Sequence, residues 1–180
     1  MLRIRPAAAR PAMLAVMMTT LALYALPASA HITLETRDYP AGSTAKLVLK
    51  VPHGCEGAPT VSLRVRIPDD VLNVKPQPKP GWQLTTVKGK LAKPITGEHG
   101  ETITESVREV RWSGGRLEDR FYDEFVFRAK LPDHPGETIY IPVVQECDKG
   151  VNRWIEIPEA GKSRRDYKYP APELHLLPTR

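Results

Sequence analysis

Apolar and polar residues alternate one by one along much of this chain, and after residue 30 no stretch has the spacing of an amphipathic helix. Leu47, Leu49 and Val51 form one such series, and alternate residues from 61 to 67 form another. A period of two indicates a β-strand with one buried face. Further segments of this kind lie near residues 71–75, 82–87, 102–112, 121–131, 138–145 and 152–157.

Seven to nine such strands, separated by turn residues, predict an all-β fold: an antiparallel β-sandwich of immunoglobulin-like or fibronectin-like topology. The 18 prolines, mostly at strand ends, fit the edges and turns of such sheets. We expect residues 31–158 to form this single domain. Residues 92–100 are predicted to form a long hairpin loop, and residues 159–180 a proline-rich, charged C-terminal tail.

The first thirty residues have the three parts of a secretory signal peptide. Arg3, Arg5 and Arg10 precede an apolar run over residues 13–26, and Ala28-Ser29-Ala30 supplies the small residues at a cleavage site. The apolar run is too short for a comfortable membrane span. The pattern therefore predicts a periplasmic or secreted protein with no transmembrane anchor, whose mature chain begins at His31.

Removal of this segment changes the charge and the composition. It holds three of the 26 Lys+Arg and none of the 21 Asp+Glu, so the net charge falls from +5 to +2. Without a strongly basic face, nucleic acid is not an expected partner. All four methionines also lie in the segment, so the mature chain has none.

Two cysteines, Cys55 and Cys147, remain in the mature chain. An even number of cysteines in an oxidising compartment favours a disulfide. Closing so long a loop is worth roughly 4–5 kcal/mol in the chain-entropy model. The alternative is a pair of thiols that bind a metal.

A histidine at a new N-terminus has a chemistry that an internal histidine lacks. Its free α-amine and its ring Nδ1 can chelate one metal ion, and the amine has a pKa of about 8. Such a nitrogen pair suits Cu(II), the strongest binder among divalent first-row ions, and a carboxylate from elsewhere would complete the ligand set. The alternative for His31 is a solvated chain end. The histidines at 53, 99, 134 and 175 lack the spacing of a conventional zinc site.

Five ordered motifs are spread over most of the mature chain. They are H-I-T-L-E at 31–35, V-P-H-G-C-E-G-A-P-T at 51–60, P-x-P-x-P-G-W at 76–82, Y-D-E-F-V-F-R-A-K-L-P at 122–132 and V-V-Q-E-C-D-K-G-V-N-R-W at 143–154. Together they resemble the YcnI-like copper-binding domain family. The resemblance implies a β-sandwich that binds Cu(II) through a single-histidine brace, in which a glutamate and a nearby tryptophan accompany the N-terminal histidine.

By motif position, the resemblance assigns the brace to His31, the glutamate to Glu124 and the tryptophan to Trp154. Alternation places Glu124 opposite the apolar face of Phe121, Phe125, Phe127 and Ala129. It also places Trp154 on the face opposite Ile155 and Ile157, away from the core, either as a lid over a metal or packed under the C-terminal tail. Asp123 and Glu156 are the fallback carboxylates.

We therefore expect a non-enzymatic Cu(II)-binding protein of copper homeostasis or trafficking. The absence of methionine and the expected disulfide argue against a soft Cu(I) site. The partners would be the copper ion and a periplasmic Cu(I) chaperone or a copper membrane transporter. Two other classes stay open: a copper monooxygenase with a second brace histidine, such as His53, His99 or His134, and a metal-free Ig-like interaction module.

Overall fold

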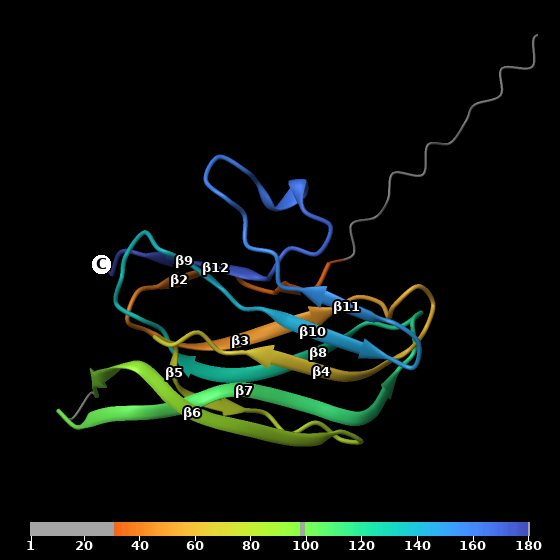
Figure 1. Cartoon of the computed structure of the whole chain (residues 1–180), viewed down its shortest axis with the longest axis horizontal. Helices are drawn as coiled ribbons and strands as arrows, with labels where there is room; N and C mark the ends of the chain where they lie inside the picture. The colour runs from red at the N-terminus through yellow and green to blue at the C-terminus, as the bar shows by residue number, and fades with distance from the viewer. Residues whose placement is uncertain (1–30, 98–99, 180) are drawn as a thin grey trace, which may run out of the picture.

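The computed structural model describes residues 31–97 and 100–179 (Figure 1). The expected signal peptide and His99 lie outside these residues. Within them the chain forms twelve β-strands and one short 3-10 helix, η1 (Arg164–Asp166). None of the described helices is long and apolar enough to cross a membrane.

Nine of the strands form two main sheets. In spatial order the four-stranded sheet contains β1 (Thr33–Leu34), β3 (Thr44–Val51), β8 (Asp123–Lys130) and β5 (Leu72–Pro76). The five-stranded sheet contains β11 (Val151–Trp154), β10 (Val143–Cys147), β4 (Thr60–Arg66), β7 (Thr102–Leu117) and β6 (Gln83–Thr96). All neighbours in both sheets are antiparallel. The predicted antiparallel sandwich is confirmed.

Side chains that alternate along the strands fill the core between the sheets. Leu47 and Leu49 from β3 and Leu63 and Val65 from β4 are fully buried, as their spacing predicts. Aromatic rings join the layers: the ring centroid of Phe125 on β8 lies 5.5 Å from that of Trp112 on β7 and 5.0 Å from that of Trp82. Phe121, expected on the same face, is instead 52% exposed because β8 begins only at Asp123.

A disulfide between Cys55 and Cys147 ties the loop after β3 to the end of β10. The two Cα atoms are 6.0 Å apart, across 92 residues of sequence. The predicted bond is confirmed, and these two sulfurs are therefore not thiol ligands for a metal.

A third sheet lies outside the sandwich expected from the sequence. It contains β2 (Asp38–Pro40), β12 (Glu173–Leu177) and β9 (Thr138–Tyr140), and β12 runs parallel to β2. Leu174 and Leu176 of β12 are buried in the core. Here the structure differs from the tail predicted over residues 159–180. The apolar pattern of this short strand is not recognisable in the sequence, because prolines and charged residues surround it.

The segment from 155 to 172, which we call the C-terminal segment, links β11 to β12. It arches over the place where the described chain begins, as the blue ribbon above the orange one in Figure 1 shows. The hairpin of β6 and β7 also differs from expectation. Its strands pair as far as Thr96 and Thr102, so most of the expected loop at 92–100 is strand.

If β12 is part of the core, Leu174→Ala should lower the free energy of unfolding by about 2–5 kcal/mol, since it removes a fully buried side chain. The matched control is Leu177→Ala on the same strand, which is 46% exposed and should cost less than about 0.5 kcal/mol. Urea denaturation followed by circular dichroism measures both. Equal, small effects would mean that β12 does not contribute to the core.

Candidate functional site

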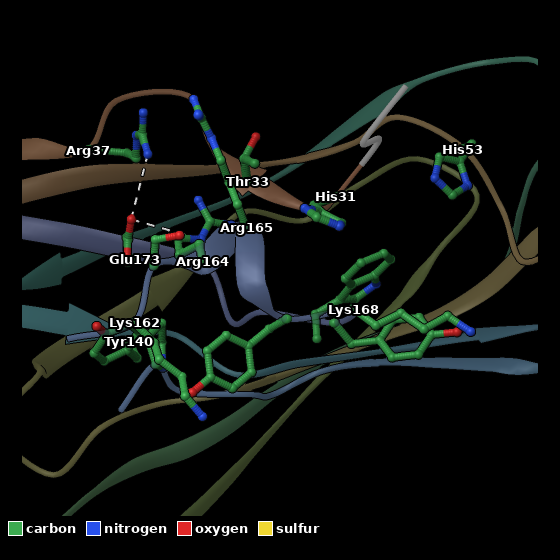
Figure 2. Close-up of a pocket in the computed structure, with 15 residues that line it drawn as sticks. His31, Thr33, Arg37, His53, Tyr140, Lys162, Arg164, Arg165, Lys168 and Glu173 are labelled. Carbon is green, nitrogen blue, oxygen red and sulfur yellow. Dashed lines mark ion pairs between the residues drawn. The ribbon is translucent and has the colours of Figure 1, made fainter. Parts of the chain in front are cut away.

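His31 lies two residues before Thr33, where β1 begins at the edge of the four-stranded sheet. Ile32 and Leu34 point into the core, so alternation turns His31 and Thr33 to the other side. Pairing of Thr33 with Lys50 and of Leu34 with Leu49 fixes this start of the chain. The half-buried His31 borders a pocket of about 900 Å³, which we call the His31 pocket (Figure 2). Trp154 and several residues between 158 and 169 also line it.

The ring of Trp154 packs against that of His31. Their centroids are 5.3 Å apart at an interplanar angle of 61°, an edge-to-face contact. Trp154 is the last residue of β11, the edge strand of the five-stranded sheet. The contact therefore joins the edges of the two main sheets.

The structure brings His31 and Trp154 together as expected but reverses the predicted faces of the last strand. Trp154 is buried in the core, whereas Ile155 and Ile157 are 44% and 52% exposed. The strand ends at Trp154, so both isoleucines belong to the C-terminal segment. Tyr169 of that segment packs on the other side of Trp154, with ring centroids 5.3 Å apart. Packing under the C-terminal segment and contact with His31 thus occur together.

Burial lowers the pKa of the His31 ring below its usual value, and the charges of Arg164 and His53 lower it further. A hydrogen bond to the backbone of Lys168 acts in the opposite direction without reversing the shift. A lowered pKa favours the neutral ring, which is the form that binds a metal.

Gln145 on β10 holds this corner together. Its side-chain Nε2 donates hydrogen bonds to the carbonyl of His53 (2.7 Å) and to Oγ1 of Thr60 (2.8 Å). Its Oε1 accepts hydrogen bonds from Nε1 of Trp154 (3.0 Å) and Nδ2 of Asn152 (3.4 Å). Gln145 was not among the residues predicted for the site. The available signal is a glutamine two residues after Val143, on the same buried strand face.

Glu124 lies away from the His31 pocket. It pairs with Lys50, which pairs with Thr33, so Glu124 is two strands from β1, about 10 Å across the sheet. It is half-buried on the side opposite Phe125, as alternation predicts, and borders a separate cavity of about 100 Å³ with Lys79. The structure does not bring Glu124 and His31 to one pocket.

The two fallback carboxylates have structural contacts. Asp123 pairs with Nζ of Lys79 at 2.7 Å and accepts a hydrogen bond from the backbone N–H of Glu124. Glu156 accepts a hydrogen bond from the backbone N–H of Tyr169 at 2.5 Å and so anchors the C-terminal segment. Among the described residues, the one carboxylate that borders the His31 pocket is Glu173, which lies 3.6 Å from Arg37 and 3.8 Å from Arg164.

Comparison with known proteins identifies the family. Residues 31–176 match the family described as "Domain of unknown function (DUF1775)". This chain belongs to the DUF1775 family. The match begins at His31 and extends to Leu176 in β12, and it confirms the family that the motifs indicated.

One relative and one solved structure add detail for this DUF1775 domain. The copper-binding protein CutI of Bacillus subtilis (strain 168) is 28% identical over 135 residues, which are 75% of this chain but 60% of CutI. A crystal structure from Nocardia farcinica, titled as revealing an immunoglobulin-like fold, is 24% identical with a TM-score of 0.60. That match covers 82% of this chain and 99% of the other. It confirms the predicted Ig-like fold.

A second group of metal-ligating side chains lies elsewhere on the DUF1775 domain. Ligand atoms of Asp70, His134 and Glu137 lie within 4.8 Å of one another, and Nδ1 of His134 is 3.0 Å from Oε2 of Glu137. Residue spacing did not predict this group, because Asp70 comes from a distant loop. His134 and Glu137 are exposed, so this group is a control that any copper titration needs.

Removal of the Gln145 side chain should destabilise the domain. We expect Gln145→Ala to lower the free energy of unfolding by about 2–4 kcal/mol, since it leaves buried partners without hydrogen bonds. Gln83→Ala, at an exposed position on β6, is the control and should change it by less than about 0.5 kcal/mol. Chemical denaturation measures both variants. A stable Gln145→Ala protein with an unchanged near-UV spectrum of Trp154 would contradict this role.

Proposed function

We propose that this protein binds Cu(II) after export and serves copper homeostasis or trafficking in the periplasm. The metal is held by the α-amine and ring Nδ1 of His31, beside Trp154. The observation that carries the proposal is the position of His31: the histidine with which the family match begins borders a pocket and contacts a buried tryptophan. We propose a binding protein rather than an enzyme.

The chemistry of the donors supports copper as the cargo. Amine and imidazole nitrogens suit Cu(II), and the lowered pKa of the His31 ring favours its metal-binding form. The mature chain has no methionine, and both of its cysteines are in the disulfide. It therefore has no thioether or free thiolate, the soft ligands that Cu(I) prefers.

The comparison with CutI also supports copper as the cargo, without specifying its oxidation state. CutI is named as a copper-binding protein. The present chain spans about 60% of the length of CutI, so the role of the whole relative is not transferred. Transfer of the copper to a periplasmic Cu(I) chaperone would require an external one-electron reductant that converts Cu(II) to Cu(I). This chaperone or a copper membrane transporter is the partner in the proposal.

The N-terminal chelate is tested by blocking the amine. We expect exported protein that begins at His31 to bind one Cu(II) tightly, and protein with an extra methionine before His31 to bind far more weakly. The loss should exceed the roughly 10–100-fold that follows loss of a residue which only orients a ligand. Isothermal titration and electron paramagnetic resonance measure it, with mass spectrometry to verify the N-terminus.

The control for this titration is His134→Ala, which removes one member of the Asp70 group and should leave tight binding intact. Equal binding by the blocked and unblocked proteins would overturn the N-terminal chelate. If neither preparation bound copper, the metal-free interaction module would be favoured.

The positions of the strands give little support to a protein carboxylate as the oxygen ligand of the copper. Glu124 is the predicted ligand, but it lies two strands from β1. We therefore expect Glu124→Gln to change Cu(II) affinity by less than about threefold, well under the roughly 10–100-fold loss that follows removal even of a residue which only orients a ligand. A loss of more than about 100-fold by isothermal titration would restore Glu124 as the ligand.

One observation bears on the enzyme alternative. His53 borders the same pocket as His31, and a histidine-brace monooxygenase requires a second histidine. The Nδ1 of His53 is 2.5 Å from the carbonyl oxygen of Gly54. We expect His53→Ala to keep tight Cu(II) binding and the same resonance spectrum. Loss of a nitrogen signal from that spectrum would instead support the two-histidine enzyme.

A further inference from the structure

Positive side chains surround the His31 pocket. The described residues that border it include Arg37, Lys162, Arg164, Arg165 and Lys168 but, as a carboxylate, Glu173 alone. Figure 2 shows several of these side chains around His31. All but Arg37 come from the C-terminal segment. Lys162 has its own partner, Glu159, at 2.8 Å. Among the described residues, no carboxylate lies within ion-pair distance of Arg165 or Lys168.

Arg164 is the central member of this group. Its side chain is only 16% exposed, and its Nε and Nη2 atoms are buried without a hydrogen-bond partner among the described residues. Its nearest carboxylate, that of Glu173, is 3.8 Å away from Nε and is shared with Arg37. Buried guanidinium donors without acceptors are costly, and an oxyanion satisfies them because its oxygens match the planar fork of arginine.

The backbone around Arg164 is held in place. Asp166 accepts hydrogen bonds from the backbone N–H (2.7 Å) and the hydroxyl (3.1 Å) of Ser163, which closes the turn of η1. Glu156 anchors the far end of the segment at Tyr169. The two arginines of η1 are thus presented by a braced turn rather than by a loose tail.

We propose that the His31 pocket binds a small dicarboxylate or tricarboxylate, with one carboxylate on Arg164 and a second presented to the metal on His31. The anion supplies the oxygen ligand that Glu124 does not bring to this pocket. The excess of positive charge favours a multiply charged ligand, and the tyrosines at 140, 167 and 169 line the cavity for its carbon skeleton. The role of the second carboxylate rests on the proposed copper function, whereas the binding of the anion does not.

The first experiment uses metal-free protein that begins at His31. Isothermal titration with succinate and citrate should show saturable binding, tighter for citrate and weakened by salt. Arg164→Gln should weaken it about tenfold or more, because a charge-assisted hydrogen bond in a partly buried site is lost. Arg128→Gln, at an exposed position on β8 outside the pocket, is the matched control and should leave it unchanged.

Arg165→Gln is the second variant, since it neutralises an exposed pocket charge with less risk to folding, and it should also weaken citrate binding. Thermal melts verify that each variant is folded. Absence of citrate binding, or equal binding by Arg164→Gln, Arg165→Gln and wild type, would overturn the proposal. Tighter binding of inorganic phosphate than of succinate would overturn the carboxylate class.

The second experiment separates the anion site from the copper site. His31→Ala should lose tight Cu(II) binding but keep citrate binding within about threefold, since the main anion contact is Arg164. In Cu(II)-loaded protein, succinate labelled with ¹³C at its carboxyl groups should give a ¹³C coupling in electron–nuclear double resonance. Citrate binding without any such coupling from succinate would refute the role as a copper ligand, and failure of copper binding alone would refute only the proposed function.

Discussion

The buried side chain of Gln145 makes the hydrogen bonds on which the candidate site depends. It connects the loop of His53, the hydroxyl of Thr60 and the indole of Trp154, which come from three separate parts of the chain. The disulfide between Cys55 and Cys147 ties the same loop to the same strand. Because the hydrogen bonds of Gln145 are satisfied on both its nitrogen and its oxygen, the indole of Trp154 is held in one position. His31 then packs against a fixed surface.

This corner is also where the two sheets meet the C-terminal segment. β1 and β11 are edge strands, and an edge strand needs a cover. The segment supplies it by packing Tyr169 on Trp154 and by returning as β12 between β2 and β9. The cover brings a group of positive side chains to the pocket of His31. The C-terminal segment therefore both covers the edges of the sandwich and supplies most of the positive charge in the pocket.

A two-nitrogen chelate and an arginine-lined pocket fit one functional picture. In the proposed function, the α-amine and imidazole of a chain-terminal histidine bind copper, and the positive charge of the pocket beside it is proposed to attract an oxyanion. A protein that takes its oxygen ligand from solution can release copper when that ligand leaves. The affinity of such a site depends on the anion as well as on the metal.

Much of the fold follows from short-range patterns. Alternation in residues 47–51 and 61–67 determines buried strand faces, because neighbouring side chains in a strand must point to opposite sides. It could not reveal β12, since a five-residue strand between prolines carries too little pattern. It also misjudged the face of Trp154, because alternation holds only where the strand continues, and β11 ends at that residue.

For the site, the sequence by itself determined the residue types: a histidine that directly follows the predicted signal peptide, and a pair of cysteines. Only the tertiary structure decided which of them meet. It placed Trp154 against His31, kept Glu124 two strands away, and brought Arg164 to the pocket from what had been expected to be a tail. The reason is physical: strand register and the return of the C-terminal segment join residues that are distant in sequence, and local patterns do not encode either.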